Sequence, residues 1–349
     1  MDNVYPVIER AASAADSGDL EELRMCLREA GEPSEVSPGL SDYFVSGLAA
    51  HLKGERHANL YLRVKGAPQI DLFYLMHQHL PFLQAGTLAN DALLEYCAGH
   101  QSATILSLGI GQGRQEMDLV ARSALEKVTI VGVDVSGQIL DAAERVLTGP
   151  ESPVRAAVDF RPVLAASEGI GDDVWAMIEH LPRPLLITAS FALHHMLDRP
   201  GEGDARTALL RRLRLLEPTA LALCEPDSDH HRVPLPVRLA NAWRHYGTVF
   251  AAIDATGATR DQKDEMKRFF GREIENVVGA TSEETRYERH EPTLTWINRL
   301  TDCGFTPVSL PQPPTGQPEG FTTVARRTHL ELAYENTPVA AVIVAEPVR

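Results

Sequence analysis

The sequence predicts an α/β protein built on a doubly wound parallel sheet, with additional helices before the sheet and in an insertion after its fifth strand. Short apolar segments alternate with amphipathic helical segments between residues 103 and 227, which is typical of a parallel sheet covered on both faces. The segments before residue 100, and those between residues 231 and 275, have helical patterns only. A glycine-rich turn follows the first predicted strand, where open α/β sheets commonly bind ligands.

The first hundred residues are predicted to form helices. Asp19 is a suitable N-cap with Glu22 in the capping-box position, and Pro81 interrupts the last helical stretch. Strands and helices then alternate. The predicted strands are residues 103–111, 128–136, 154–165, 184–193 and 219–227, and the helices between them are residues 113–125, 136–149, 172–181 and 206–218.

The alternation stops after the fifth predicted strand. Two long helical stretches, residues 235–256 and 260–280, have the character of an insertion into the sheet domain. A further helix is predicted over residues 291–305. Two late apolar segments, residues 306–311 and 340–348, are predicted to form an antiparallel pair at the edge of the sheet.

The composition argues against a nucleic-acid-binding protein and against a membrane-spanning protein. The 349 residues carry a net charge of −15, which makes nucleic acid an unlikely partner because phosphate contacts need basic side chains. No apolar run is long enough to span a membrane, and the N-terminal segment is charged and amphipathic rather than a signal peptide. The four cysteines form no CxxC pair, so we expect buried free thiols in a cytoplasmic protein. A homodimer is one option for the assembly of the chain.

Three glycines, Gly109, Gly111 and Gly113, form the pattern GxGxG in the first strand-to-helix turn. Glycine permits a positive φ and lets a ligand approach the backbone closely. A dinucleotide-binding turn would have its third glycine at position 114, which is Arg114 here. The pattern instead resembles the loop of S-adenosylmethionine-dependent methyltransferases, so S-adenosylmethionine is the expected cofactor. The alternative is a tight turn that only packs helix against strand.

Two polar residues accompany this turn. Asp134 ends the second predicted strand, 134 − 113 = 21 residues after the last glycine, where a carboxylate can accept hydrogen bonds from both ribose hydroxyls. Alternatively, Asp134 caps the next helix together with Ser136. Ser107 occupies the position where such methyltransferases usually have an acid near the amino-acid moiety of the cofactor. Serine keeps a hydrogen-bond acceptor there but lacks the charge.

Several stretches resemble the GRAS family, which is known mainly from plant transcriptional regulators. The stretch over residues 103–116 resembles the family's VHIID block, of which Gln112, Gly113 and Gln115 are kept. The "ENVV…YERHE…W" stretch is the most specific part of the resemblance. The likeness covers about residues 10–310, and the plant family's Trp-containing C-terminal segment is missing. The matching blocks are residues 103–116, 236–256 and 271–305.

The resemblance implies a Rossmann-like class I methyltransferase sheet with a helical cap. The intact glycine loop resembles that of bacterial relatives of the family, which are expected to methylate small molecules. The domains implied are an N-terminal cap (residues 1–100), an S-adenosylmethionine-binding core (101–230), a helical insertion that joins the cap (231–275) and the C-terminal part of the core (276–349).

His194 and His195 close the fourth predicted strand in "ASFALHHML", a segment similar to one that faces cofactor and substrate in many class I methyltransferases. Methyl transfer from a sulfonium is an in-line displacement, which the enzyme mainly aligns. A hydroxyl or amine acceptor also benefits from a base near neutral pH, and histidine is suited to this role. We therefore expect one of the two histidines to be catalytic, or else to pack and hydrogen-bond only.

A polar segment after the fifth strand, the inserted helix and the "ERHE" motif are predicted to line a substrate pocket. A solvated loop, an Arg–Glu pair and a solvent-facing helix surface are the alternatives. Adjacent histidines lack the i, i+4 spacing of a helical zinc motif, so no metal is expected. The candidate substrate-binding residues are Glu225, Asp227, His230, Arg244, Tyr246, Arg289 and Glu291.

These observations support two hypotheses. The main expectation is an S-adenosylmethionine-dependent methyltransferase that methylates an oxygen or nitrogen of a small molecule, for example a carboxylate or hydroxyl. The alternative is a non-catalytic GRAS-type regulatory module that binds a small ligand or a protein partner, and Ser107 favours this second hypothesis.

Overall fold

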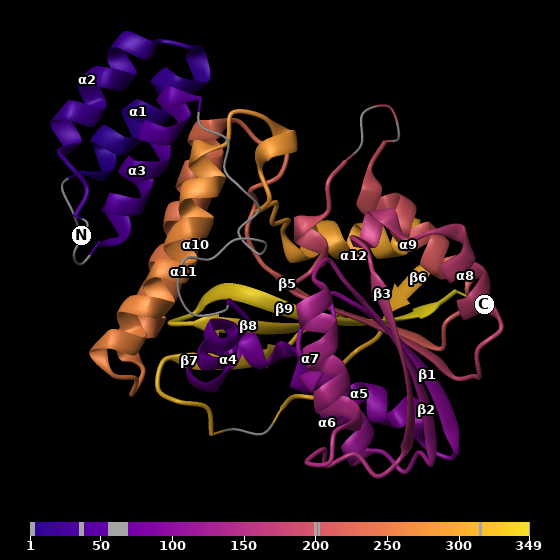
Figure 1. The fold of residues 1–349 in the computed structure, drawn as a ribbon. Coiled ribbons are helices and arrows are strands. Elements are labelled where there is room, and N and C mark those ends of the chain that lie inside the picture. Colours follow the sequence, from indigo (N-terminus) through magenta and orange to yellow (C-terminus); the bar gives the residue numbers. More distant parts are fainter. Residues whose placement is uncertain are drawn as a thin grey trace. The chain divides into compact units, whose positions relative to one another are not determined.

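The computed structural model describes residues 4–34, 38–54, 69–198, 201, 203–313 and 316–348 (Figure 1). The chain divides into two compact units, each built from two separate segments. We call the first the helical unit (Met1–Leu80 and Asp227–Pro292) and the second the sheet unit (Pro81–Pro226 and Thr293–Arg349).

The sheet unit contains one nine-stranded sheet in the order β3-β2-β1-β4-β5-β9-β8-β7, with β6 paired to β9. Strands β1 to β5 are parallel, and β9 runs antiparallel to β5, β6 and β8. The strand order reverses between β1 and β4, as in a doubly wound sheet. The predicted α/β fold class is therefore confirmed. The strands are β1 (Ser102–Leu108), β2 (Lys127–Asp134), β3 (Ala157–Leu164), β4 (Leu185–Ser190), β5 (Ala220–Pro226), β6 (Phe305–Pro307), β7 (Phe321–Ala325), β8 (Leu330–Tyr334) and β9 (Thr337–Pro347).

Helices pack on both faces of the sheet because the central strands are apolar on both sides. Leu106 of β1 shares a buried cluster with Trp175, Leu210 and Trp296, which belong to the three helices of one face, α8 (Asp172–Glu179), α9 (Ala205–Leu215) and α12 (Thr293–Asp302). Successive side chains of a strand point to opposite faces, so Ser107 faces the other side. Helices of that side are α5 (Ala85–Cys97), α6 (Arg114–Arg122) and α7 (Gly137–Thr148).

The helical unit joins N-terminal helices to two long inserted helices. The predicted capping of the second helix is confirmed, since the N–H of Glu22 donates to Asp19 Oδ1 at 3.0 Å. Helices α3 and α11 approach closely at Gly47, where a Cβ would lie 2.5 Å from Val278 Cγ2. The helices are α1 (Tyr5–Ser17), α2 (Leu20–Ala30), α3 (Leu40–Lys53), α4 (Gln69–His79), α10 (Leu235–Ala255) and α11 (Arg260–Gly279).

The C-terminal strands differ in part from the expectation. The predicted antiparallel pair exists as β6 with β9, but β9 lies inside the sheet rather than at its edge. Two strands that were not predicted, β7 and β8, continue the sheet beyond β9. The four cysteines are free and buried, as expected. None of the helices in the described part of the chain has the length and apolar content needed to cross a bilayer.

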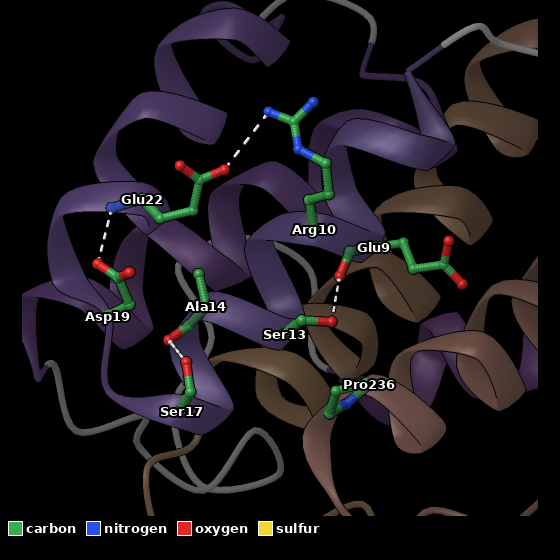
Figure 2. Close-up of a pocket in the computed structure, with 8 residues that line it drawn as sticks. All are labelled: Glu9, Arg10, Ser13, Ala14, Ser17, Asp19, Glu22 and Pro236. Carbon is green, nitrogen blue, oxygen red and sulfur yellow. Dashed lines mark hydrogen bonds and ion pairs between the residues drawn. The ribbon is translucent and has the colours of Figure 1, made fainter.

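A cavity of about 520 Å³ lies on the helical unit beside α1 and α2 (Figure 2). The polar groups of this cavity already take part in contacts of α1 and α2. Arg10 of α1 lies 3.6 Å from the carboxylate of Glu22 in α2, and Asp19 caps α2. No residue that the sequence singled out for binding lines it. The lining residues are Glu9, Arg10, Ser13, Ala14, Ser17, Asp19, Glu22 and Pro236.

Candidate functional site

The glycine turn joins β1 to α6, and its three glycines have different reasons to be glycine. Gly109, Gly111 and Gly113 all have positive φ, at 72°, 54° and 68°. A Cβ on Gly109 would lie 2.5 Å from the Cβ of Ala192, and one on Gly113 would lie 3.3 Å from a methyl of Leu147. A Cβ on Gly111 would meet no described atom within 4 Å. Gly109 and Gly113 therefore serve packing, whereas Gly111 leaves bare backbone beside open space.

Asp134 lies beside this turn at the end of β2. Its Oδ2 accepts a hydrogen bond from the Gly111 N–H at 3.3 Å, and its Oδ1 accepts one from the Ser136 N–H at 3.0 Å. Burial raises the pKa of the carboxyl, and these hydrogen bonds offset part of the rise. Ser136 is the N-cap residue of α7, but its side chain makes no capping bond. Asp134 thus stabilises the glycine turn through hydrogen bonds within the protein itself.

Ser107 has an acidic partner that the sequence reading missed. Its hydroxyl donates to Glu116 Oε1 at 2.8 Å, and Thr188 of β4 donates to the same oxygen at 2.9 Å. Glu116 is buried, and burial raises the pKa of its carboxyl. Its second oxygen, Oε2, has no hydrogen-bond partner among the described residues. The carboxyl group absent from β1 is therefore supplied from α6, nine residues later.

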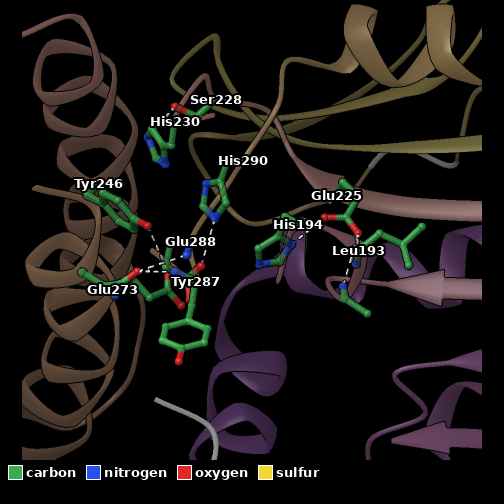
Figure 3. Close-up of polar contacts among 12 residues, drawn as sticks. Leu193, His194, Glu225, Ser228, His230, Tyr246, Glu273, Tyr287, Glu288 and His290 are labelled. Carbon is green, nitrogen blue, oxygen red and sulfur yellow. Dashed lines mark hydrogen bonds and ion pairs between the residues drawn. The ribbon is translucent and has the colours of Figure 1, made fainter. Parts of the chain in front are cut away.

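His194 forms a buried pair with Glu225, the last residue but one of β5 (Figure 3). The distance from His194 Nδ1 to Glu225 Oε2 is 2.5 Å, and Glu225 Oε1 accepts from the Leu193 N–H at 2.8 Å. Burial alone would raise the pKa of Glu225, but the charge and hydrogen bond of His194 hold that pKa below its usual value. Arg206 donates to the carbonyls of Leu193 and His194. Glu225 thus orients His194 and the turn that carries it.

The second histidine of the motif is less enclosed. The ring of His195 is only partly buried and packs against His194 with centroids 3.8 Å apart. Nothing in the structure tests a catalytic role for either histidine. The hydrogen bonds of His194 agree with the packing alternative that the sequence left open.

Six of the seven predicted substrate-binding residues belong to the helical unit, and only Glu225 belongs to the sheet unit. His230 is buried, bonds Ser228 through Nε2 at 2.9 Å, and stacks on Tyr246 with centroids 5.8 Å apart. The Tyr246 hydroxyl donates to Glu273 Oε2 of α11 at 3.1 Å. His230 and Tyr246 are thus brought together, as Figure 3 shows.

The structure also places the remaining candidates. Asp227 and Glu291 form a parallel backbone bridge, which joins the two ends of the inserted segment. Arg289 is buried and donates to the carbonyl of Glu283. Arg244 is exposed on α10.

The fold and the glycine turn define the class, an α/β protein with a Rossmann-like sheet. The GRAS domain family matches residues 7–326, and the chain belongs to this family. The crystal structure of SCL7 from Oryza sativa has a TM-score of 0.78 and 22% identity, covering 99% of this chain and 100% of that one.

Curated relatives are plant proteins. Chitin-inducible gibberellin-responsive protein 2 of Oryza sativa is 30% identical over 87% of this chain and 58% of its own length. Scarecrow-like transcription factor PAT1 of Arabidopsis thaliana is 24% identical over 83% of this chain and 62% of its own length. The chain therefore spans less than two thirds of these relatives.

The comparisons correct the functional prediction. The family match covers most of the chain, and relatives matched along it are named as a transcription factor and a gibberellin-responsive protein. Likeness to S-adenosylmethionine-dependent methyltransferases is only distant, with a TM-score of 0.40 and 16% identity for the one from Listeria monocytogenes. The prediction of an enzyme that methylates a small molecule is wrong. The likeness to bacterial members of the family is not supported either.

Proposed function

We propose that this chain is a non-catalytic regulatory module of the GRAS type, whose sheet unit binds a small adenosine-bearing ligand at the glycine turn. The regulatory part is supported by family membership and by relatives named as a transcription factor and a gibberellin-responsive protein. The ligand would act as a regulatory signal through its binding to the protein, and it would not be converted chemically.

The observation that carries the ligand part is the bare backbone at Gly111. Its φ of 54° and the open space beside its Cα let a ligand approach more closely than any side chain would allow. Asp134 is bonded to the same turn and would hold the ribose hydroxyls, while Ser107, Gly109 and Gly113 would shape the turn. The Glu116 carboxyl group, which accepts a hydrogen bond from Ser107, adds a polar group next to this turn.

Calorimetry with S-adenosylmethionine, its demethylated product and adenosine tests this proposal. We expect dissociation constants of roughly micromolar size for at least one of them, and no conversion of S-adenosylmethionine. Gly111→Ala should weaken binding at least about tenfold, because the added Cβ fills the approach and strains a positive φ. Gly257→Ala is the matched control, since that glycine is exposed, has no neighbour within 4 Å and has an ordinary φ.

Two results would contradict the proposal separately. If none of the three compounds gives heat of binding, the ligand part of the proposal is wrong, and a module that binds only proteins is then favoured. Steady conversion of S-adenosylmethionine into its demethylated product would remove the non-catalytic part. The cytoplasmic location, the homodimer, the domain boundaries and the contact of the remaining candidate residues with a small molecule stay predictions.

A further inference from the structure

The helical unit contains a compact group of buried metal-ligating side chains that the proposed function does not use. Glu273 lies on α11, and Glu288 and His290 lie on the segment that precedes α12 (Figure 3). Their exposed fractions are 7%, 0% and 2%. One ligand atom from each residue lies within 4.8 Å of the other two. Three potential ligands from two segments thus converge inside one unit.

Hydrogen bonds hold these ligands in place before any ion arrives. Asn276 of α11 is fully buried, and its Oδ1 accepts the Glu288 N–H at 3.1 Å, which ties the segment to the helix. The Tyr246 hydroxyl donates to Glu273 Oε2 at 3.1 Å and orients that carboxylate. Ligands fixed by such partners bind metals more tightly than mobile ones.

His230 provides a second, independent indication. Its ring is completely buried and stacks on His290, with centroids 4.6 Å apart. Its Nδ1 has no hydrogen-bond partner among the described residues. This unpartnered nitrogen beside the ligands can bond a water that completes the coordination of an ion.

The separations suit a small divalent ion. Zinc binds nitrogen and oxygen at about 2.0–2.2 Å, which puts tetrahedral ligand atoms about 3.4 Å apart. His290 Nε2 and Glu288 Oε2 are already 3.3 Å apart. No two of the three ligand atoms lie more than 4.8 Å apart, so they would have to approach one another by at most about 1.4 Å, which small side-chain adjustments can supply. Two carboxylates would also balance the two charges of the ion in a buried setting.

We propose that Glu273, Glu288 and His290 form a structural site for a divalent transition-metal ion, with Zn²⁺ as the best match to one imidazole and two carboxylates. With a water in the fourth position the site would have three protein ligands, and the burial of all three together with their origin in two segments favours a role in stabilising the unit. The ion would fasten the segment of Glu288 to α11.

The test uses the full chain freed of metal with a chelator. Zn²⁺ is titrated by calorimetry, and Co²⁺ is added as a spectroscopic probe. We expect one ion per chain, an intense visible Co²⁺ spectrum of low coordination number without a thiolate charge-transfer band, and a higher melting temperature with Zn²⁺. Glu288→Gln and His290→Gln should each lose more than about 100-fold in affinity, because loss of mere outer partners already costs 10–100-fold.

Glu284→Gln is the matched control, because Glu284 is exposed and four residues away from Glu288. It should bind the ion as the wild type does. Affinity for Zn²⁺ that is unchanged in both site variants would overturn the proposal, and so would a thiolate band. If the variants do not fold, the Co²⁺ spectrum of the wild type is the deciding measurement. The weak spectrum of the hydrated ion would show that the cluster does not bind a metal ion, and would overturn the proposal.

Discussion

The Glu225–His194 pair shows how one carboxylate can decide the local structure. Glu225 accepts hydrogen bonds from the Leu193 amide and from His194, while both lie in the turn after β4. In a buried pair, removing one charge costs more than the pair itself contributes, because the remaining partner stays desolvated. The turn beside the glycine loop therefore depends on a residue at the end of the neighbouring strand.

Glu225→Gln should lower the free energy of unfolding by about 3 kcal/mol, because His194 loses its buried counter-charge. Urea denaturation at pH 7 measures this change. Glu126→Gln, an exposed change just before β2, should alter stability by less than about 0.5 kcal/mol. Equal stability of the two variants would mean that the contacts of Arg206 with the turn are sufficient.

Glu283 makes a pH-dependent contribution to the helical unit. Burial would raise its pKa, but His231 and Arg286 lower the pKa to about 2. A carboxyl with a folded pKa below its unfolded value of about 4.3 stabilises the protein above pH 4.3 and loses this effect as the pH falls towards 2.

We therefore expect Glu283→Gln to be less stable than the wild type at pH 6, and the difference to disappear between about pH 4.3 and 2. The pKa difference alone would correspond to about 3 kcal/mol, but the side chain is 49% exposed, so screening should leave about 1 kcal/mol. Denaturation curves of both proteins at several pH values measure the difference. A difference that persists at low pH would show that it does not come from the charge.

The position of the glycine turn could be predicted from the sequence, whereas side-chain partners on other elements could not. The glycines could be predicted because their spacing follows a strand directly. Glu116 could not, because an acid was sought within β1 and the helix that follows supplies it. Glu273 was missed for a similar reason: its partner Tyr246 lies 27 residues earlier on another helix.

At the scale of elements, the contact between α3 and α11 depends on the absence of a side chain. A Cβ at Gly47 would lie 2.5 Å from Val278 Cγ2 and 3.1 Å from the Cα and carbonyl oxygen of Glu275. Because part of this obstacle is backbone, a rotamer change cannot relieve it completely. The two helices would have to move apart and would expose their buried faces.

Gly47→Ala should therefore destabilise the protein by about 1–2 kcal/mol, since overpacking costs roughly 1–3 kcal/mol and the better helix propensity of alanine returns up to about 1 kcal/mol. Thermal unfolding measures this effect. Gly257→Ala, in the loop between α10 and α11, should be neutral or slightly stabilising. A stabilised Gly47→Ala protein would show that the helices adjust at no cost.

The strands at the end of the chain show why part of the fold was missed. Tyr334 pairs with Thr337, so Glu335 and Asn336 alone form the turn between β8 and β9. Both have positive φ, at 45° and 63°, as a tight primed turn requires. The usual sequence signal for this turn ends in glycine, and Glu-Asn does not carry it. The parallel strands lacked this difficulty because each is a continuous apolar run between helices.

At the scale of the whole molecule, each unit is assembled from two segments that are far apart in the sequence. The helical unit needs both the first 80 residues and the segment Asp227–Pro292, and the Asp227–Glu291 bridge joins the ends of that segment. Neither unit corresponds to one continuous piece of chain. The folding of each unit therefore requires contacts of long sequence separation, which slow folding in general.

The placement of the thiols has a practical consequence for following that process. Cys26 lies in the helical unit, whereas Cys97, Cys224 and Cys303 lie in the sheet unit. Burial raises the pKa of Cys97 to about 11 and that of Cys224 to about 12, so an alkylating reagent should modify them only after local opening. Mass spectrometry of alkylated peptides at increasing urea should therefore time the opening of each unit separately. Identical modification rates for Cys26 and Cys224 would show that both units open in one cooperative step.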